Sequence, residues 1–473
     1  MCPTYIRFCL ALNKISPPPE DGFSYCELGM GRGVSANLHA AANDGDFSGM
    51  DFNPDHAAYA GDLARRTQSG LRVSDDSFET FLNRNHPGYD FVCLHGGWSW
   101  ISEANRLRVV EFAKRYLKAG GVFYLSYNCH PGWTTSAPLR ALFKLFDDHY
   151  GNGHTSENRI RQAVSLTGKL LEADPLFCNS SNWIKERFAH LCKESAEYLA
   201  HEFFNADWHI AYFMDVARML ADAKLRFGAS AVAQNNIPQF GLTENAREFM
   251  RQIDDPVVCQ QLWDFFCNTQ FRTDYFIKGG IELSGEEQRQ MLLGQRFVLT
   301  TPPADMEFIL DCGMGTFQLD KQGHETVVQA LAADGGMPKT LACLEDELKG
   351  TLQFTQILHV LTRLLGKAYV HPCQREESAE KVRGRCASMN REILRQSAVS
   401  DRLRHLVSPE TGGGITVTLE NRRSLFRTAQ ESEAGASQSP EAGTQQQTTA
   451  SSDEAFAAHI LPVLRPLGIL PES

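Results

Sequence analysis

The sequence predicts an α/β protein, in which a domain with a parallel sheet is followed by an α-helical domain and a small α+β domain. Three changes of pattern along the chain predict this order. From Phe23 to about Trp133, short apolar segments alternate with amphipathic helical segments. From Ala137 to about Gly280, strand patterns disappear and helical periodicity takes over. From Gln288 onward, short apolar segments precede about three helices.

The first domain is expected to hold five strands with helices on both faces of the sheet. The helix between the last two strands is the clearest, because Glu103–Leu117 has strong amphipathic spacing. The five expected strands are Ser24–Leu28, Phe47–Phe52, Leu71–Ser74, Asp90–His95 and Val122–Tyr127.

Composition divides the rest of the chain. The segment Glu431–Asp453 contains mainly Ser, Gln, Thr, Glu, Gly and Ala, so it cannot bury a core and is expected to be a disordered tether. The apolar stretch Ala455–Ile469 is expected to dock back as a short helix and turn. The predicted divisions are residues 1–136 (parallel-sheet domain), 137–284 (helical domain), 285–427 (α+β, winged-helix-like), 428–454 (linker) and 455–473 (terminal segment).

Charge and cysteine usage exclude several classes of protein. The net charge of −11 over 473 residues argues against a nucleic-acid binder. The 13 cysteines include no CxxC pair, so a structural zinc site has no suitable spacing, and we expect no metal. Scattered cysteines, with no recognisable signal peptide and no apolar run long enough to span a bilayer, favour reduced thiols in a cytoplasmic protein.

A glycine-rich turn follows the first expected strand. Residues 27–33 read Glu-Leu-Gly-Met-Gly-Arg-Gly, so Gly29, Gly31 and Gly33 alternate with larger residues. Glycines permit a tight turn from strand to helix and let a ligand approach the backbone. Such a turn alone is weak evidence, but its place after the first strand of a Rossmann-like sheet favours a nucleotide-containing cofactor.

An acidic residue follows the second strand at the expected distance. Asp51 stands 20 residues beyond Gly31, where a carboxylate can bind ribose hydroxyls, and Phe52 beside it belongs to the same expected cofactor site. These features leave NAD and S-adenosylmethionine as rivals.

The turn reads Glu-Leu-Gly-x-Gly-x-Gly and not the Gly-x-Gly-x-x-Gly of NAD-binding proteins, which favours S-adenosylmethionine. Two further details agree. Asp76 and Ser77 follow the third strand, where an acid and a serine fit the adenine edge. Glu27 at the glycine turn would repel the pyrophosphate of NAD, whereas S-adenosylmethionine has none.

The motifs together resemble a known family. Residues 27–33 (ELGMGRG), 49–54 (GMDFNP), 91–102 (FVCLHGGWSWIS) and 121–133 (GVFYLSYNCHPGW) are similar to class I methyltransferases. Residues 198–205 (YLAHEFFN), 212–217 (YFMDVA) and 268–272 (NTQFR) resemble a bacterial methyltransferase regulatory domain. Rickettsial methyltransferases that modify lysines of an outer-membrane protein share this arrangement, so the resemblance implies a protein lysine as acceptor.

Candidate residues for the chemistry follow the fourth and fifth strands, because ligands of such sheets bind at the carboxyl ends of the strands. Trp98, Tyr127 and Trp133 are expected to form an aromatic wall that holds a cationic amine by its ring faces, and Asn128 is expected to accept a hydrogen bond from the amine. His95 is expected over the adenosine or near the methyl group. The alternative is that the aromatic residues, with Trp133, only pack against the helical domain.

The helical domain directly follows the fifth strand, so we expect it to cover the site and exclude water. The opposite wall would come from Phe203, Phe204, Trp208, Tyr212 and Phe213. A protein is the expected partner and a homo-oligomer is compatible with the sequence. Two other functions stay open: methylation of a small molecule or sugar, and cofactor binding without catalysis.

Overall fold

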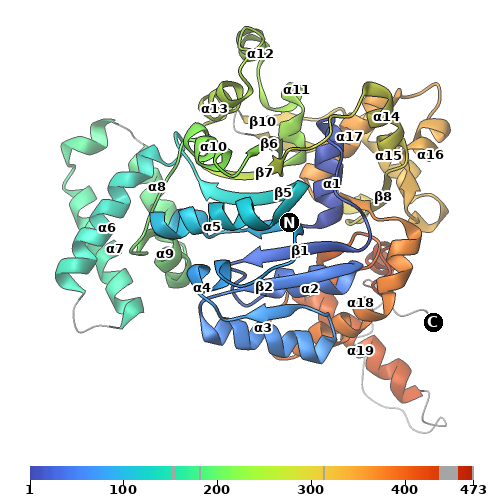
Figure 1. Cartoon of the computed structure of the whole chain (residues 1–473), viewed down its shortest axis with the longest axis horizontal. Helices are drawn as coiled ribbons and strands as arrows, with labels where there is room; N and C mark the ends of the chain where they lie inside the picture. Colours follow the sequence, from blue (N-terminus) through green and yellow to red (C-terminus); the bar gives the residue numbers. More distant parts are fainter. Residues whose placement is uncertain (152–154, 181–182, 313–314, 436–455, 457, 471–473) are drawn as a thin grey trace.

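The structure is a computed structural model of the whole chain. It describes residues 1–473 except 152–154, 181–182, 313–314, 436–455, 457 and 471–473 (Figure 1).

A seven-stranded sheet forms the centre of the molecule (Figure 1). Its strand order is β3-β2-β1-β4-β5-β7-β6, in which β1 to β5 run parallel and β7 runs antiparallel to both β5 and β6. The order reverses between β1 and β4, which is where ligands bind in sheets of this type. The strands are β1 (Phe23–Leu28), β2 (Gly45–Met50), β3 (Arg72–Ser74), β4 (Tyr89–Leu94), β5 (Leu117–Asn128), β6 (Leu225–Ser230) and β7 (Phe271–Lys278).

Alternating residues of the strands bury opposite faces of this sheet. Tyr25 and Phe91 pack with alanines of α2 (Val34–Ala42) and α3 (Pro54–Thr67) on one face. Cys26 and Val92 belong to the core of the other face. That core takes side chains from α4 (Phe78–Leu82), α5 (Glu103–Tyr116) and α10 (Phe213–Ala221). The five strands predicted from the sequence are therefore confirmed as β1 to β5.

A helical lobe follows β5 and has a core of its own (Figure 1). Trp133, Phe143 and Phe203 are among its buried residues. Residues 183–203 form two helices, because the chain leaves helical geometry between 191 and 196. The lobe consists of α6 (Ala137–Tyr150), α7 (Ser156–Glu172), α8 (Trp183–Leu191) and α9 (Ala196–Phe203).

The expectation that 137–284 is helical throughout is wrong. The chain returns to the central sheet in β6 and β7, and the helices α11 (Pro238–Gly241), α12 (Glu244–Met250) and α13 (Pro256–Cys267) lie between them in sequence. Seven residue pairs join β7 to β5, from Val122 with Ile277 to Asn128 with Phe271. Both strands are short segments between helices, and their partners are distant in sequence, so local periodicity does not reveal them.

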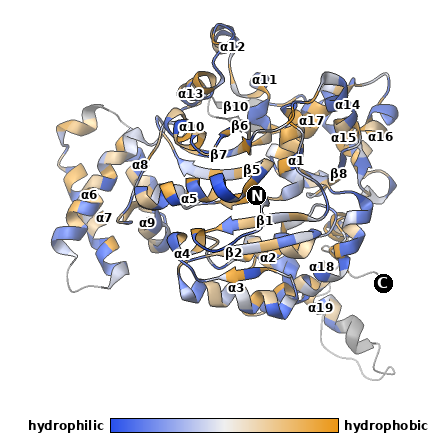
Figure 2. Ribbon diagram, in the orientation of Figure 1, coloured by the Kyte–Doolittle hydropathy of each residue, from blue (hydrophilic) through white to orange (hydrophobic). Residues whose placement is uncertain are grey.

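The chain beyond β7 forms a mixed α/β region with three small sheets. The sheet β11-β8-β12 packs with α1 (Pro3–Leu12) in one apolar core, and Figure 2 shows apolar residues along both α1 and α17. The elements here are α14 (Gly285–Leu293), β8 (Arg296–Leu299), β9 (Ile309–Cys312), β10 (Gly315–Gln318), α15 (Lys321–Ala332), β11 (Lys339–Thr340), α16 (Leu341–Glu347), α17 (Phe354–Gly366) and β12 (Val370–Cys373).

The last part of the chain packs against helices α2 and α3. Helix α18 (Glu376–Ser397) contacts α2 and α3, and the hairpin of β13 (His405–Ser408) and β14 (Gly413–Thr416) contacts α2. The predicted tether Glu431–Asp453 begins inside α19 (Leu419–Gly435), and residues 436–453 lie outside the described residues. The predicted docking of the terminal segment is confirmed by α21 (Leu461–Leu464) and by the buried Leu467 and Ile469.

Among the helices that the structure describes, none is long and apolar enough to cross a membrane.

Candidate functional site at the carboxyl ends of the strands

The backbone conformation of the turn at residues 29–33 requires glycine at three positions. Gly29, Gly31 and Gly33 all have φ near +60° (64°, 57° and 63°), where larger residues are strained. A Cβ on Gly33 would lie 2.6 Å from the Cβ of Ala60, so the start of α2 packs tightly on α3. A Cβ on Gly31 would meet no atom within 4 Å. The turn is therefore closed toward α3 at Gly33 and open at Gly31.

Asp51 holds this turn to the end of β2. The Gly31 amide donates to Asp51 Oδ2 at 2.8 Å, and the Asn53 amide donates to Oδ1 at 3.0 Å. His56 Nδ1 lies 3.2 Å from Oδ1. Asp51 is buried, whereas the ring of Phe52 beside it is 74% exposed. The predicted pair thus supplies a fixed carboxylate and a free aromatic face at one corner of the sheet.

Asp76 and Ser77 have local partners after β3. Asp76 is buried, pairs with Arg84 Nη2 at 2.6 Å and accepts a hydrogen bond from the Ser74 hydroxyl. The Ser77 hydroxyl accepts from the Thr80 amide at 3.1 Å, so it caps α4. Both residues are positioned at the strand end, although their side chains also serve the local fold.

Glu27 is enclosed between β1 and α2. Ser35 donates to Glu27 Oε1 at 2.7 Å and Tyr25 donates to Oε2 at 3.1 Å. Burial raises the pKa of Glu27. With 2% of its surface exposed, Glu27 links strand and helix rather than facing the open part of the turn.

His95 lies at the exposed end of β4 with its Nδ1 turned inward. That nitrogen is 2.8 Å from the Tyr124 hydroxyl and 3.1 Å from the Ser126 hydroxyl. Partial burial lowers the pKa of His95. The partly exposed Phe271 of β7 meets its ring edge-on, with the ring centres 6.5 Å apart. The imidazole of His95 and the ring of Phe271 therefore lie together at the carboxyl end of β4.

The side chains of Tyr127 and Trp98 do not line an accessible surface of the candidate site. Tyr127 is fully buried and donates to Asp274 Oδ2 at 2.9 Å. Trp98 is 1% exposed and packs in the core on the face of the sheet that α4, α5 and α10 cover. The expectation that these rings face an amine is contradicted by their burial, because both side chains complete the apolar core instead.

Asn128 joins the end of β5 to the helical lobe. Its Nδ2 donates to Glu202 Oε2 on α9 at 3.2 Å, and Asn128 is 2% exposed. Burial raises the pKa of the half-buried Glu202 above its usual value. On the same helix, His201 lies against the Trp100 ring with the ring centres 4.4 Å apart. Sequence alone leaves Glu202 as one of several polar residues in an aromatic stretch, and its contact with Asn128 is seen only in the folded chain.

The aromatic residues expected to form an opposite wall divide between two cores. Trp133 packs against Phe203 and Trp208, with ring centres 5.5 and 6.0 Å apart. Phe213 packs instead against Phe276 in the sheet core. These contacts agree with the alternative that the aromatic residues only pack, but they do so in two separate cores.

A buried ionic cluster lies behind the end of β5. Arg272 pairs with Asp264 of α13 at 2.8 Å and with Asp274 at 2.7 Å. Burial alone would lower the pKa of Arg272, but Asp274, Tyr127 and Asp264 raise it well above its usual value. Burial raises the pKa of Asp264 to about 6. The cluster joins β5, β7 and α13, and so ties the region beyond the helical lobe to the strand that ends at Asn128.

Among the described residues, no group of three or more His, Cys, Asp and Glu side chains is arranged to hold a metal ion.

Comparison with known proteins identifies the kind of fold. Residues 195–278 match a family described as a predicted methyltransferase regulatory domain. The chain is 34% identical over 407 residues to the uncharacterized protein sll1526 of Synechocystis, covering 85% of this chain and 79% of that protein. It is 24% identical over 300 residues to the uncharacterized protein RP789 of Rickettsia prowazekii, covering 60% of this chain and 51% of that protein.

Two solved structures share the fold over nearly the whole length. PKMT2 from Rickettsia typhi in complex with AdoHcy superposes with a TM-score of 0.67 at 15% identity, covering 98% of this chain and 96% of that one. A second structure of PKMT2 gives a TM-score of 0.69 at 14% identity, covering 99% and 98%. The expected Rossmann-like fold is confirmed, and so is the expected similarity to a methyltransferase regulatory domain over residues 195–278.

Proposed function

We propose, from the premise that this chain belongs to the same family as Synechocystis sll1526, that it transfers methyl groups from S-adenosylmethionine to lysine side chains of a protein. In fold, the chain is a class I, S-adenosylmethionine-dependent methyltransferase with a regulatory domain. The observation that carries the proposal is the meeting of the glycine turn with Asp51, at the point where the strand order reverses.

The residues at the strand ends fit S-adenosylmethionine. The open side of Gly31 lets a ligand approach the backbone, and Asp51 is fixed where it can accept from ribose hydroxyls. The exposed Phe52 ring offers a face for adenine, and Asp76 with Ser77 would meet the adenine edge. His95 would border the methyl-bearing end. The cofactor would supply an activated methyl group on a sulfonium sulfur.

The amine acceptor would bind where Glu202 meets Asn128. A lysine must lose its proton before it attacks, because an ammonium has no free electron pair. The ammonium would therefore release one proton first, and the neutral nitrogen would then take the methyl group that the cofactor supplies. Glu202 would hold the ammonium by charge and accept that proton, while Asn128 fixes the carboxylate. The half-buried setting of Glu202 favours this role, since partial dehydration strengthens charge interactions.

The choice of protein lysine rests on similarity to a protein named as PKMT2 and on the lobe of α6 to α9 beside β5. A small molecule or sugar as acceptor, or cofactor binding without turnover, would be outcomes of the test. We also propose that residues 285–427 form a winged-helix-like unit, from the sheet β11-β8-β12 and the helices α15 to α17. The predicted boundary at residues 284 and 285 and a cytoplasmic location are part of the same proposal, whereas β6 and β7 of the predicted helical domain belong to the central sheet.

Labelled S-adenosylmethionine supplied to the purified chain with a cell lysate tests the function. We expect label on protein bands, resistant to mild base as methylated amines are, and mass spectrometry should place it on lysine. Asp51→Ala should abolish labelling, and Asp75→Ala, an exposed neighbour of Asp76, serves as the matched control. Label only in small molecules would contradict the protein acceptor. Cofactor binding without any label would contradict catalysis.

A further inference from the structure

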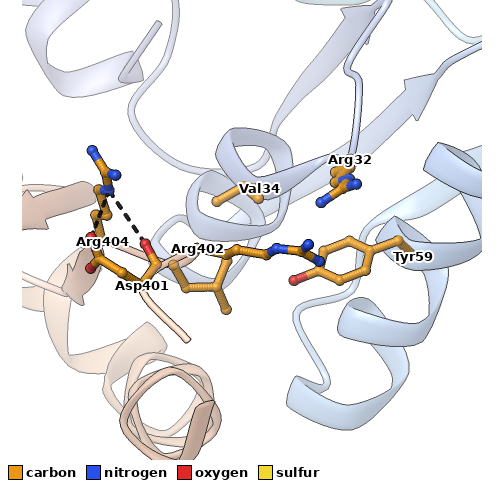
Figure 3. A pocket seen from close by; sticks show the side chains of 7 residues that line it. Arg32, Val34, Tyr59, Asp401, Arg402 and Arg404 are labelled. Carbon is orange, nitrogen blue, oxygen red and sulfur yellow. Dashed lines mark hydrogen bonds and ion pairs between the residues drawn. The ribbon is translucent and has the colours of Figure 1, made fainter. Parts of the chain in front are cut away.

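A pocket lies behind the glycine turn, where the end of the chain meets the cofactor half of the sheet (Figure 3). Its volume is about 420 Å³, which is in the range of small-ligand sites. One wall belongs to the glycine turn, α2 and α3, and the other to the segment between α18 and β13. The lining residues are Arg32, Val34, Tyr59, Asp401, Arg402, Leu403 and Arg404.

Two arginines on opposite walls are not neutralised. Figure 3 shows the side chain of Arg402 extended across the pocket toward the side that carries Tyr59 and Arg32. The Arg32 guanidinium lies 5.8 Å from the centre of the Tyr59 ring. In the part of the chain that the structure describes, neither Arg32 nor Arg402 forms an ion pair. Two guanidinium groups that share a pocket repel each other unless an anion lies between them.

The acidic residue of the pocket is already paired. Asp401 Oδ2 lies 3.3 Å from Arg404 Nε, and its Oδ1 pairs with Nη2 of the buried Arg422. Figure 3 shows Arg404 bonded to Asp401 rather than crossing the pocket. The lining therefore holds one carboxylate against three arginines, which gives the pocket a net positive charge. The chain as a whole carries a net charge of −11, so this is a local reversal of sign.

The segment that presents Arg402 is held in place from behind. Arg422 of α19 is 1% exposed and donates to the Val417 carbonyl at 2.9 Å as well as to the Leu403 carbonyl and Asp401. The buried Leu403 belongs to the core that joins α18, β13 and α2. Arg402 therefore extends from a fixed backbone, which reduces the entropy lost when it binds a ligand.

We propose that this pocket binds the phosphate or diphosphate group of a small molecule, held between Arg32 and Arg402. Guanidinium groups match phosphate oxygens in charge and in geometry, and form strong charge-assisted hydrogen bonds with them. The Tyr59 ring beside them suits an uncharged planar part of the same ligand. A site of this volume favours a small ligand over a nucleic acid, which the acidic surface of the chain would repel.

The ligand would act on the cofactor site through the glycine turn. Arg32 follows Gly31, whose amide is bonded to Asp51, so an anion that fixes Arg32 also fixes the turn. The phosphate ligand is therefore an effector that strengthens binding of S-adenosylhomocysteine, and the coupling is reciprocal. The binding site itself does not depend on the proposed methyl acceptor.

Titration calorimetry of the full chain with pyrophosphate at low ionic strength tests the site. We expect saturable binding that weakens in about 0.15 M salt. Arg402→Gln should reduce the affinity at least about tenfold, since it removes one of two unpaired guanidinium groups. Arg391→Gln, an exposed arginine of α18, is the matched control and should bind as wild type does. Saturating pyrophosphate should raise the affinity for S-adenosylhomocysteine about fivefold or more in wild type, and not in Arg402→Gln.

Absence of binding to wild type, or equal binding to Arg402→Gln, overturns the site. Tighter binding of an acidic peptide or an oligonucleotide than of pyrophosphate overturns the assignment to a small phosphate ligand. Binding that leaves the affinity for S-adenosylhomocysteine unchanged overturns the effector role. Circular dichroism of both variants shows whether a loss of binding comes from a loss of fold.

Discussion

The guanidinium of Arg272 is held edge-on by the carboxylate of Asp274, two residues further along β7. Arg272 Nε donates to Asp274 Oδ2 at 2.7 Å and Nη2 donates to Oδ1 at 3.0 Å. Asp264 takes one bond from Nη1 at 2.8 Å, and its Oδ2 has no partner. The two acids therefore make unequal contributions to one buried arginine.

Replacing the two acids separately should show this difference. Asp274→Asn removes the paired charge and disturbs the Tyr127 bond, so it should lower the free energy of unfolding by about 3–5 kcal/mol. Asp264→Asn should cost clearly less, because Arg272 keeps its two bonds to Asp274. Urea unfolding followed by circular dichroism measures both. An equal or larger loss in Asp264→Asn would contradict the assigned roles.

The pH dependence of stability should isolate Asp264. Its pKa rises from 3.8 to about 6 on folding, so the folded carboxyl keeps a proton that the unfolded one has released. A raised pKa of an acid contributes stability at low pH, and this contribution is lost as pH rises between these two values. The Asp264→Asn variant has no carboxyl at this position, so its free energy of unfolding does not fall with pH for this reason. The free energy of unfolding of Asp264→Asn relative to wild type should therefore increase from pH 4 to pH 7, and a flat difference would refute the shift.

Asp51 should be essential for cofactor binding. Asp51→Ala removes the acceptor of the Gly31 amide and the carboxylate expected at the ribose, a charged hydrogen bond of about 1.5–3 kcal/mol. The affinity for S-adenosylhomocysteine should fall about 10- to 100-fold by titration calorimetry. The exposed Asp75→Ala should bind normally. Unchanged affinity in Asp51→Ala would place the ribose elsewhere.

Tyr127 should matter for stability rather than turnover. Tyr127→Phe keeps the buried ring and loses one bond to Asp274, so we expect about 1 kcal/mol less stability and near-normal kcat. Trp98→Ala leaves a large cavity in the core and should cost about 3–5 kcal/mol. If Tyr127→Phe lowers kcat strongly and leaves the stability unchanged, Tyr127 takes part in the reaction and the packing role assigned here is wrong.

Glu202 should control the acidic limb of the rate profile. Because burial raises the pKa of Glu202, kcat should fall as pH drops toward a value above 4.5, the usual pKa of the group. Glu202→Gln should lower kcat by about 100-fold or more and remove this limb, with cofactor affinity unchanged. Glu197→Gln, exposed on the same helix, is the control. If kcat of Glu202→Gln still falls at low pH, a group other than Glu202 accepts the proton of the amine.

The sequence by itself determined the parallel half of the sheet and the place of the cofactor turn. Alternation of strands and helices in β1 to β5, the glycines with positive φ and the acid after β2 are local patterns, and each is fixed by backbone geometry over a few residues.

Only the tertiary structure decided where the side chains beyond this turn point. Strand β7 is defined by its pairing with β5 and β6 by its pairing with β7, Tyr127 is turned to Asp274, and Asn128 meets Glu202 of α9. The phosphate pocket brings Arg32 to Arg402, which is 370 positions away in the sequence. Such contacts depend on which faces the apolar cores bury together, and periodicity along the chain carries no information about that choice.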